Sequence, residues 1–245
     1  MSRFREKVAI VSGGASGIGL ATALRLGSEG ARVVVADIDP AVAARVPDLM
    51  AAGAPDAAAF TCDVSRPDDV EQAVAETVSR FGRLDVVVNS AGVMVFKLIA
   101  ELDPADWQRV LGINLLGAAY FIRAGVRNMV GGGAIVNVAS IHAEQTTPLV
   151  ASYAASKAGL LSLTRSAAIE ARPLGIRVNA VEPGAIDTPM LWSNPNVQSG
   201  EEVIVPADVG KPGDIAAAVA FLASADAAFI TGACLRADGG RLARL

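Results

Sequence analysis

The sequence predicts an α/β fold: a single doubly wound parallel sheet of the Rossmann type, with helices on both faces. Short β-branched runs alternate with longer alanine-rich stretches along the 245 residues, a pattern typical of such sheets. A glycine cluster lies directly between the first expected strand and the first expected helix. Hydrophobic residues make up 52% of the chain and charged residues 19%, so a sizeable core can form.

The expected strands are short apolar or β-branched runs bounded by turn-forming residues. They cover residues 8–11, 33–36, a run ending near 61, 84–88, 134–139, 178–181 and 234–237. The run at 84–88 is continuously apolar, as expected of a central strand that is buried on both faces.

The expected helices fill the intervals between these strands. They cover residues 17–30, about 41–52, 67–81, 152–171 and 212–223, with two further helical stretches between 104 and 128 that are bent near 112–117. Pro67 suits the first position of its helix, where a missing N–H costs nothing.

The stretch from 187 to 207 has no clean period and contains three prolines, Pro189, Pro195 and Pro206. A loop of this length inside a compact domain is usually functional and often forms a lid. Because no linker or internal repeat interrupts the chain, we expect a single domain over residues 1–245 with a substrate loop at about 187–207.

The formal net charge of -4 argues against a nucleic-acid partner or an anionic membrane surface. The two cysteines, Cys62 and Cys234, lie far apart in the sequence and are expected to be buried free thiols, with no metal site. The N-terminal residues lack an apolar signal core. The most apolar helix candidate, 215–223, is shorter than the roughly 18 residues that a membrane span needs. We therefore expect a cytoplasmic protein.

The glycine cluster, residues 12–19, reads Ser-Gly-Gly-Ala-Ser-Gly-Ile-Gly. Glycine permits a sharp turn and a close approach of the backbone to a pyrophosphate. A helix that begins near Gly17 directs free amides and a partial positive charge at that anion. A plain tight turn would use the same residues, but the position between a strand and a helix favours phosphate binding.

Asp37 lies 18 residues after Gly19, at the end of the second expected strand. A carboxylate there can accept hydrogen bonds from both hydroxyls of an adenosine ribose and repels a 2′-phosphate. None of Ala15, Ser16 and Ile38 supplies the cation that a 2′-phosphate requires. The spacing therefore predicts NAD rather than NADP as the cofactor.

Tyr153 and Lys157 lie four residues apart in an expected helix and therefore share one face. Ser140 follows the preceding strand, at the sheet edge where open α/β sheets bind ligands. A free tyrosine has a pKa of about 10, and a neighbouring ammonium group stabilises the phenolate that an alcohol-deprotonating base requires. Ser140 would donate a hydrogen bond to the substrate oxygen as charge develops there.

With these residues in view, the sequence resembles the classical short-chain dehydrogenase/reductase family over nearly its whole length. The matching segments are residues 12–19, the pair Asp63-Val64, residues 89–92, the set Asn114, Ser140, Tyr153 and Lys157, and residues 183–188. Ser12 and Ser90 depart from the family pattern, which has threonine and asparagine there; both changes keep hydrogen-bonding capacity.

The resemblance implies a catalytic set of Asn114, Ser140, Tyr153 and Lys157 and an NAD site. The implied cofactor contacts are Gly13, Ser16, Gly17, Ile18, Gly19, Asp37, Asp63, Val64, Asn89, Ala91, Gly92, Tyr153, Lys157, Pro183, Gly184, Ile186 and Thr188. It further implies that Asn114 lies at a helix bend and holds a water that connects Lys157 to solvent; a purely structural role is the alternative. The family also implies a homotetramer in which the helix bearing Tyr153 packs against its twin.

The resemblance implies a small alcohol or carbonyl compound as the substrate, and two residues favour a sugar or polyol. The segment from Ser140 to His142 is similar to the Ser-x-His of glucose dehydrogenases in this family, in which the histidine lines the sugar pocket. Glu182 precedes Pro183 where a small residue is common, and a carboxylate there would bind sugar hydroxyls. A surface or loop role for His142, or an ion pair for Glu182, is the competing interpretation.

Three other functions stay open at this stage. A 3-oxoacyl-carrier-protein reductase would need a basic entrance, for which Arg109, Arg123 and Arg127 are candidates. A dehydrogenase of steroids or other apolar alcohols would need an apolar lid, for which Leu191 and Trp192 are candidates. An NAD-binding regulator without catalysis is the non-enzymatic alternative, but it would be expected to lack a member of the catalytic set.

Overall fold

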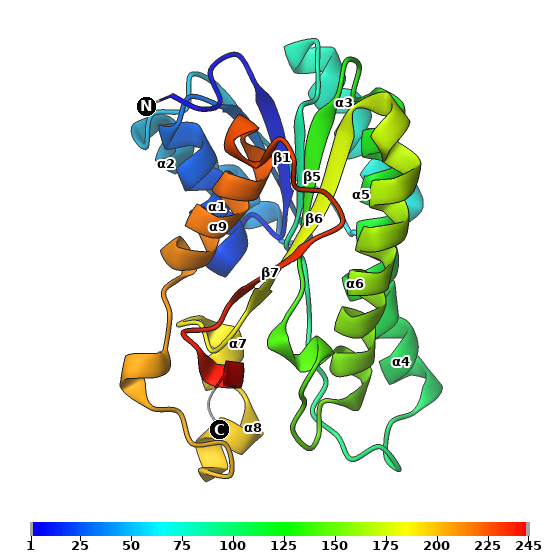
Figure 1. Cartoon of the computed structure of the whole chain (residues 1–245), viewed down its shortest axis with the longest axis vertical. Coiled ribbons are helices and arrows are strands. Elements are labelled where there is room, and N and C mark those ends of the chain that lie inside the picture. The colour runs from blue at the N-terminus through cyan, green and yellow to red at the C-terminus, as the bar shows by residue number, and fades with distance from the viewer. Residues whose placement is uncertain (1, 244–245) are drawn as a thin grey trace.

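The computed structural model describes residues 2–243 and contains one seven-stranded sheet (Figure 1). The strands are β1 (Val8–Ser12), β2 (Arg32–Asp37), β3 (Ala57–Thr61), β4 (Val86–Asn89), β5 (Gly133–Val138), β6 (Ile176–Pro183) and β7 (Cys234–Ala237). Their order in space is β3-β2-β1-β4-β5-β6-β7, and all six pairings are parallel. The predicted doubly wound parallel sheet is confirmed.

Helices cover both faces of the sheet. One face carries α1 (Gly17–Ser28), α2 (Val46–Ala51) and α9 (Pro212–Ala223), and the other carries α3 (Pro67–Phe81), α5 (Gly117–Asn128) and α6 (Ala151–Ala171) (Figure 1). Side chains alternate along a strand, so in β1 Val11 packs into the first core and Ile10 into the second. Because helices cover both faces, β1 and β4 are apolar at every position except their last residues, Ser12 and Asn89.

The strand order reverses at β1, whose neighbours are β2 on one side and β4 on the other. The connections from these strands leave in opposite directions, which opens a crevice at their carboxyl ends. The turn after β1 contacts the turn after β4 so closely that a Cβ on Gly13 would lie 2.8 Å from Ala91 Cα. Gly13 also has a φ of 66°, a left-handed conformation that favours glycine.

The helical region from residue 104 to 128 has the two stretches that were predicted. They are α4 (Pro104–Leu111) and α5, and a π-helical turn (Gly112–Leu116) joins them into one run at the position of the expected bend. The run is long and apolar enough to cross a membrane by length and composition alone. It packs against α3 and α6 and contributes Phe121 and Ala124 to the core, so its apolar residues are explained by its contacts with the rest of the fold.

Two proline-containing regions differ from the prediction. The single helix expected at 41–52 is a 3₁₀ turn (Pro40–Arg45) followed by α2, because Pro47 lacks the N–H that would continue one helix through it. The expected loop at 187–207 contains the short helices α7 (Pro189–Trp192) and α8 (Pro195–Ser199). Here the prolines occupy first helical positions, where they favour a helix start.

Candidate active site

One cavity of about 470 Å³ lies where the strands end, lined by the turns that follow β1 to β6. The sequence-predicted residues that line it are Gly13, Ser16, Gly17, Ile18, Gly19, Asp37, Asp63, Val64, Ala91, Gly92, Ser140, His142, Tyr153, Lys157, Pro183, Gly184, Ile186 and Thr188. Asn89, Asn114 and Glu182 do not line it. The fold therefore brings the glycine turn and the residues Ser140, Tyr153 and Lys157 to one space.

The glycine turn has the shape that a dinucleotide phosphate needs. A Cβ on Gly19 would lie 2.0 Å from the Gly13 carbonyl oxygen, so only glycine lets α1 pack this close to β1. The helix begins at Gly17 with an N-cap serine whose side chain makes no capping hydrogen bond. The first amides of α1 are thus available to an anion in the cavity. The residues present fit the diphosphate of a nicotinamide dinucleotide.

Asp37 ends β2 at the same end of the cavity. Its Oδ2 accepts a hydrogen bond from Ala15 N at 3.0 Å and its Oδ1 accepts one from Asp39 N at 3.1 Å. Each oxygen keeps a lone pair for a ribose hydroxyl, and the carboxylate faces a space that Ile38 and Val64 also line. A negative charge fixed here disfavours a 2′-phosphate.

Ser12 and Asn89 do not line the cavity but stabilise the segments around it through hydrogen bonds. The Ser12 hydroxyl accepts hydrogen bonds from Ser90 N at 3.2 Å and Ala91 N at 3.3 Å, so it fixes the turn after β4. The Asn89 side chain is buried and donates to Asn137 Oδ1 at 2.8 Å, across the sheet on β5. The Ser12 hydroxyl therefore fixes this turn, and Asn89 connects β4 to β5 from outside the cavity lining.

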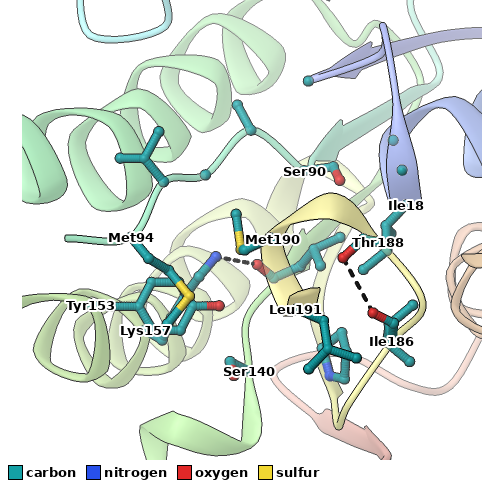
Figure 2. A pocket seen from close by; sticks show the side chains of 18 of the residues that line it. Ile18, Ser90, Met94, Ser140, Tyr153, Lys157, Ile186, Thr188, Met190 and Leu191 are labelled. Carbon is teal, nitrogen blue, oxygen red and sulfur yellow. Dashed lines mark hydrogen bonds between the residues drawn. The ribbon is translucent and has the colours of Figure 1, made fainter. Parts of the chain in front are cut away.

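Tyr153 and Lys157 lie one turn apart on α6, and both side chains point into the cavity (Figure 2). Lys157 Nζ lies 5.6 Å from the centroid of the Tyr153 ring and donates to the Val138 carbonyl at 2.8 Å. Ser140 follows β5 and caps a short 3₁₀ turn, where its hydroxyl accepts from His142 N at 3.2 Å. Strand β5 and helix α6 thus position the three functional groups.

Burial has opposite effects on the two titrating groups. It raises the pKa of the Tyr153 phenol, and a side-chain hydrogen bond with Ser140 lowers that pKa to a smaller extent. It lowers the pKa of the Lys157 ammonium to about 8. In the chain by itself, the loss of water around the phenolate therefore has the larger effect on the Tyr153 pKa.

Asn114 lies in the π-helical turn, behind the cavity wall, and is buried. Its Oδ1 accepts from Val93 N at 2.8 Å, and its Nδ2 donates to Val93 O and to Ser156 Oγ, both at 3.0 Å. A Cβ on Gly92 would lie 3.5 Å from Asn114 Oδ1 and 3.6 Å from Lys157 Nζ, so both side chains lie beside Gly92. Asn114 fixes the wall that separates it from the cavity.

Of the two residues that favoured a sugar, His142 lines the cavity and Glu182 does not. The His142 ring lines the cavity and lies edge to face with the Tyr153 ring, 5.9 Å between centroids. Burial lowers the His142 pKa, so the imidazole is neutral at neutral pH. Glu182 is 2% exposed on β6 and lies near Glu144 and Arg236, away from the cavity lining. Its register partner on β7 is Arg236, on the outer part of the sheet.

Local sequence patterns did not reveal several cavity residues. Met94, Met190 and Leu191 form an apolar wall, with Met94 next to Tyr153 and the other two across from it (Figure 2); of the three, only Leu191 was an expected lid residue. Glu202 and Arg241 also line the cavity. Met94 lies on an irregular segment and Met190 in the four-residue helix α7, neither of which gives a periodic pattern, and the meeting of Glu202 with Arg241 depends on the tertiary fold. Trp192, an expected lid residue, is half exposed and donates to Asp187 Oδ1 at 2.8 Å instead of lining the cavity.

The arginines that were candidates for a basic entrance lie outside the cavity lining. Arg123 and Arg127 both pair with Glu71 on α3, and neither these nor Arg109 line the cavity.

Cys62 is a buried free thiol at the cavity wall. Burial raises its pKa to about 12, so the thiol stays protonated. Cys234 is only partly buried. Within residues 2–243, no group of three or more His, Cys, Asp or Glu side chains is arranged to hold a metal ion.

Comparisons with known proteins agree with this geometry. A family model described as enoyl-(acyl carrier protein) reductase matches residues 13–241. A cis-4-hydroxycyclohexanecarboxylate dehydrogenase of Sinomonas cyclohexanicum is 42% identical, with 97% of each chain covered. A cyclohexanol dehydrogenase of an Acinetobacter strain is 38% identical over 97% of this chain and 96% of its own. The crystal structure of a short-chain dehydrogenase from Mycobacterium smegmatis superposes with a TM-score of 0.85 at 32% identity, covering 96% of this chain and 93% of that one.

Proposed function

The chain belongs to the classical short-chain dehydrogenase/reductase family, and from this premise we propose that it is an NAD-dependent dehydrogenase of compact cyclic secondary alcohols. The observation that carries the proposal is a single cavity lined at one end by the glycine turn and Asp37 and at the other by Ser140, Tyr153 and Lys157. Cofactor binding and acid–base chemistry thereby share one space, as hydride transfer requires.

The reaction converts a secondary alcohol to a ketone. NAD, when bound beside the glycine turn and Asp37, would accept the hydride that leaves the carbinol carbon, and Tyr153 would take the hydroxyl proton. Ser140 donates a hydrogen bond to the substrate oxygen and holds it against the phenol. The reverse reaction uses the same groups, with Tyr153 as the proton donor.

Lys157 and Asn114 support Tyr153. A base role near neutral pH requires a phenol pKa below the one that burial imposes, and the Lys157 ammonium acts in that direction, as does an oxidised nicotinamide. With a pKa of about 8, Lys157 is largely charged at neutral pH. Asn114 holds the Val93 backbone beside it and is a positioning residue.

Two observations support a cyclic alcohol as the substrate class. The wall of Met94, Met190 and Leu191 offers apolar contact to a carbon ring, and the two relatives named above act on substituted cyclohexanes by their names. The sugar hypothesis depends now on His142 alone, since Glu182 does not line the cavity. A carrier-protein substrate is disfavoured because Arg123 and Arg127 are paired with Glu71. A cytoplasmic location and a homotetramer stay predictions.

The test is a substrate screen with NAD, followed by NADH absorbance. The panel contains cyclohexanol, cis- and trans-4-hydroxycyclohexanecarboxylate, glucose, a 3-hydroxyacyl thioester and a hydroxysteroid. We expect the highest kcat/KM among the cyclohexanols and a clear preference for NAD over NADP. Higher turnover of glucose, the thioester or the steroid would contradict the proposed substrate class, and tight NAD binding without turnover of any alcohol would favour a regulator.

A further inference from the structure

The far end of the cavity contains a charged pair that the mechanism does not use. Arg241 Nη2 donates to Glu202 Oε1 at 2.6 Å, and both side chains are largely buried, with 26% and 10% of their area exposed. Glu202 comes from the segment after α8 and Arg241 from the turn after β7. Two segments distant in sequence thus place a guanidinium at the wall of the substrate space.

The structure fixes the position of Arg241 from both sides. The Asp238 carboxylate accepts hydrogen bonds from Gly240 N and Leu242 N, both at 2.9 Å, and this fixes the turn that carries the arginine. The Asn194 amide donates to the second oxygen of Glu202 at 3.3 Å. A preorganised guanidinium loses little conformational entropy when it binds a ligand.

The charges along the cavity make Arg241 the available cation. Among the described lining residues only Lys157 and Arg241 have basic side chains that are charged at neutral pH, and Lys157 donates to the Val138 carbonyl beside Tyr153. His142 is kept neutral by burial, which lowers its pKa. Glu202 takes one guanidinium hydrogen, and Nε and Nη1 of Arg241 donate to no other described residue. The second Nη2 hydrogen, together with the neighbouring Nε or Nη1 hydrogen, therefore forms a fork that no described residue occupies and that can bind an acceptor in the cavity.

The same end has room for a substituent. A second cavity of about 170 Å³ shares Ile141, His142, Glu202 and Arg241 with the main one. His142 connects the chemistry to this end, because its ring lies 5.9 Å from the Tyr153 ring and the charges of Glu202 and Arg241 act on its imidazole. A ring held at Tyr153 would therefore direct a substituent past His142 toward the guanidinium.

We propose that Arg241, oriented by Glu202, binds a carboxylate on the alcohol, so that the preferred substrate is a cyclic hydroxy acid. The inference rests on the proposed function and specifies its substrate class. A guanidinium pairs with a carboxylate through two parallel, charge-assisted hydrogen bonds, and the apolar wall contacts the ring between the two polar ends. Arg236 and Glu144 form a similar ion pair outside the cavity, which supplies a matched control.

The experiment compares 4-hydroxycyclohexanecarboxylate with its neutral primary amide, in wild type and in the variants Arg241→Gln, Arg241→Lys and Arg236→Gln. We expect wild type to prefer the acid by at least about 10-fold in kcat/KM, the value of one charge-assisted contact. Arg241→Gln should lower the value for the acid by about 10-fold or more and leave the amide within about 3-fold. Arg241→Lys should keep part of the preference, and Arg236→Gln all of it.

A second readout does not require either probe to be a substrate. Cyclohexanecarboxylate should inhibit turnover of the best alcohol at least about 10-fold more tightly than cyclohexanecarboxamide, and Arg241→Gln should remove that difference. Equal loss of acid and amide turnover in Arg241→Gln, or no acid preference in wild type by either readout, would overturn the assignment of Arg241 while the dehydrogenase function stands. Absence of turnover with every alcohol would overturn the proposed function itself.

Discussion

Lys157 Nζ lies 5.6 Å from the centroid of the Tyr153 ring, and both side chains are buried on one face of α6. An ammonium in this position stabilises a phenolate, yet burial alone acts against both charged forms. The site therefore combines a functional gain with a cost in folding stability, and the two can be measured separately.

Lys157→Met tests that cost. The folded-state pKa of Lys157 is about 8 against an ordinary 10.5, so the unfolded chain binds more protons between these values and stability rises with pH across that window. The cost is fully present below pH 8, at about 3 kcal/mol at most. Part of the stability that Lys157→Met gains is offset because the Val138 carbonyl loses its hydrogen-bond donor.

We therefore expect Lys157→Met to be inactive and more stable than wild type by about 1–2 kcal/mol at pH 7, measured by urea unfolding. The advantage should disappear above pH 10.5, where the wild-type lysine is neutral in both states. Lys211→Met, at an exposed position, serves as the control without a pH-dependent gain. A Lys157→Met protein less stable than wild type at pH 7 would show that the lysine is not under desolvation stress.

Asp37→Asn tests the cofactor preference. Asparagine keeps an acceptor for Ala15 N or Asp39 N but removes the charge that repels a 2′-phosphate. We expect the ratio of kcat/KM for NADP to that for NAD to rise by about 10-fold or more. Asp39→Asn, next to the cavity but not lining it, should leave the ratio unchanged. An unaltered ratio in Asp37→Asn would place cofactor discrimination elsewhere.

Asn114→Ala tests the positioning role. The change removes three buried hydrogen bonds to Val93 and Ser156 and should cost about 2–4 kcal/mol in the free energy of unfolding. We expect kcat to fall by about 100-fold, more than KM for the alcohol changes, together with a shifted pH–rate profile. Asn128→Ala, which removes a hydrogen bond to Ala124 on α5, is the matched control. Loss of stability with unchanged kcat and pH profile would leave Asn114 a purely structural role.

Glu182→Gln tests the position of that carboxylate. Burial raises the Glu182 pKa above its ordinary value of 4.5, so the cost of ionising it is present above the raised pKa and fades as the pH falls through it. Because glutamine carries no charge to bury, we expect Glu182→Gln to raise Tm by a few degrees at pH 7 to 8. The increase in Tm should be smaller near pH 4.5, where Glu182 is largely protonated in the folded chain. Kinetic constants for every alcohol should stay within about 2-fold. A selective loss of sugar turnover would instead return Glu182 to the substrate site.

The regular elements could be predicted where the pattern is local. The helices Pro67–Phe81 and Pro212–Ala223 and the strand Cys234–Ala237 match their expected bounds. For the two helices the reason is that a proline start and the apolar period act within a few residues. The region 187–207 could not be predicted in the same way. Its prolines start two short helices there, and α7 brings Met190 and Leu191 to the cavity only through the tertiary fold.

The residues of the candidate site also fall into two groups, those that a local sequence pattern predicts and those that it does not. The glycine turn and the pair of Tyr153 and Lys157 have fixed spacings, so the sequence indicates them directly. Glu182 was misplaced because alternation along β6 decides which face a side chain takes, and that register depends on the partner strand β7. Arg241 was not found because its partner Glu202 is remote from the motifs and the two meet only after folding.

The central claim is that Tyr153 exchanges the proton at the reacting oxygen. It is tested most directly by measuring kcat for the best alcohol and the Kd for NADH in wild type, Tyr153→Phe and Tyr120→Phe, since the chain has two tyrosines. We predict that Tyr153→Phe loses at least about 100-fold in kcat while its Kd for NADH stays within about 3-fold, and that Tyr120→Phe matches wild type in both. A Tyr153→Phe enzyme that keeps more than about a tenth of wild-type kcat would contradict the account.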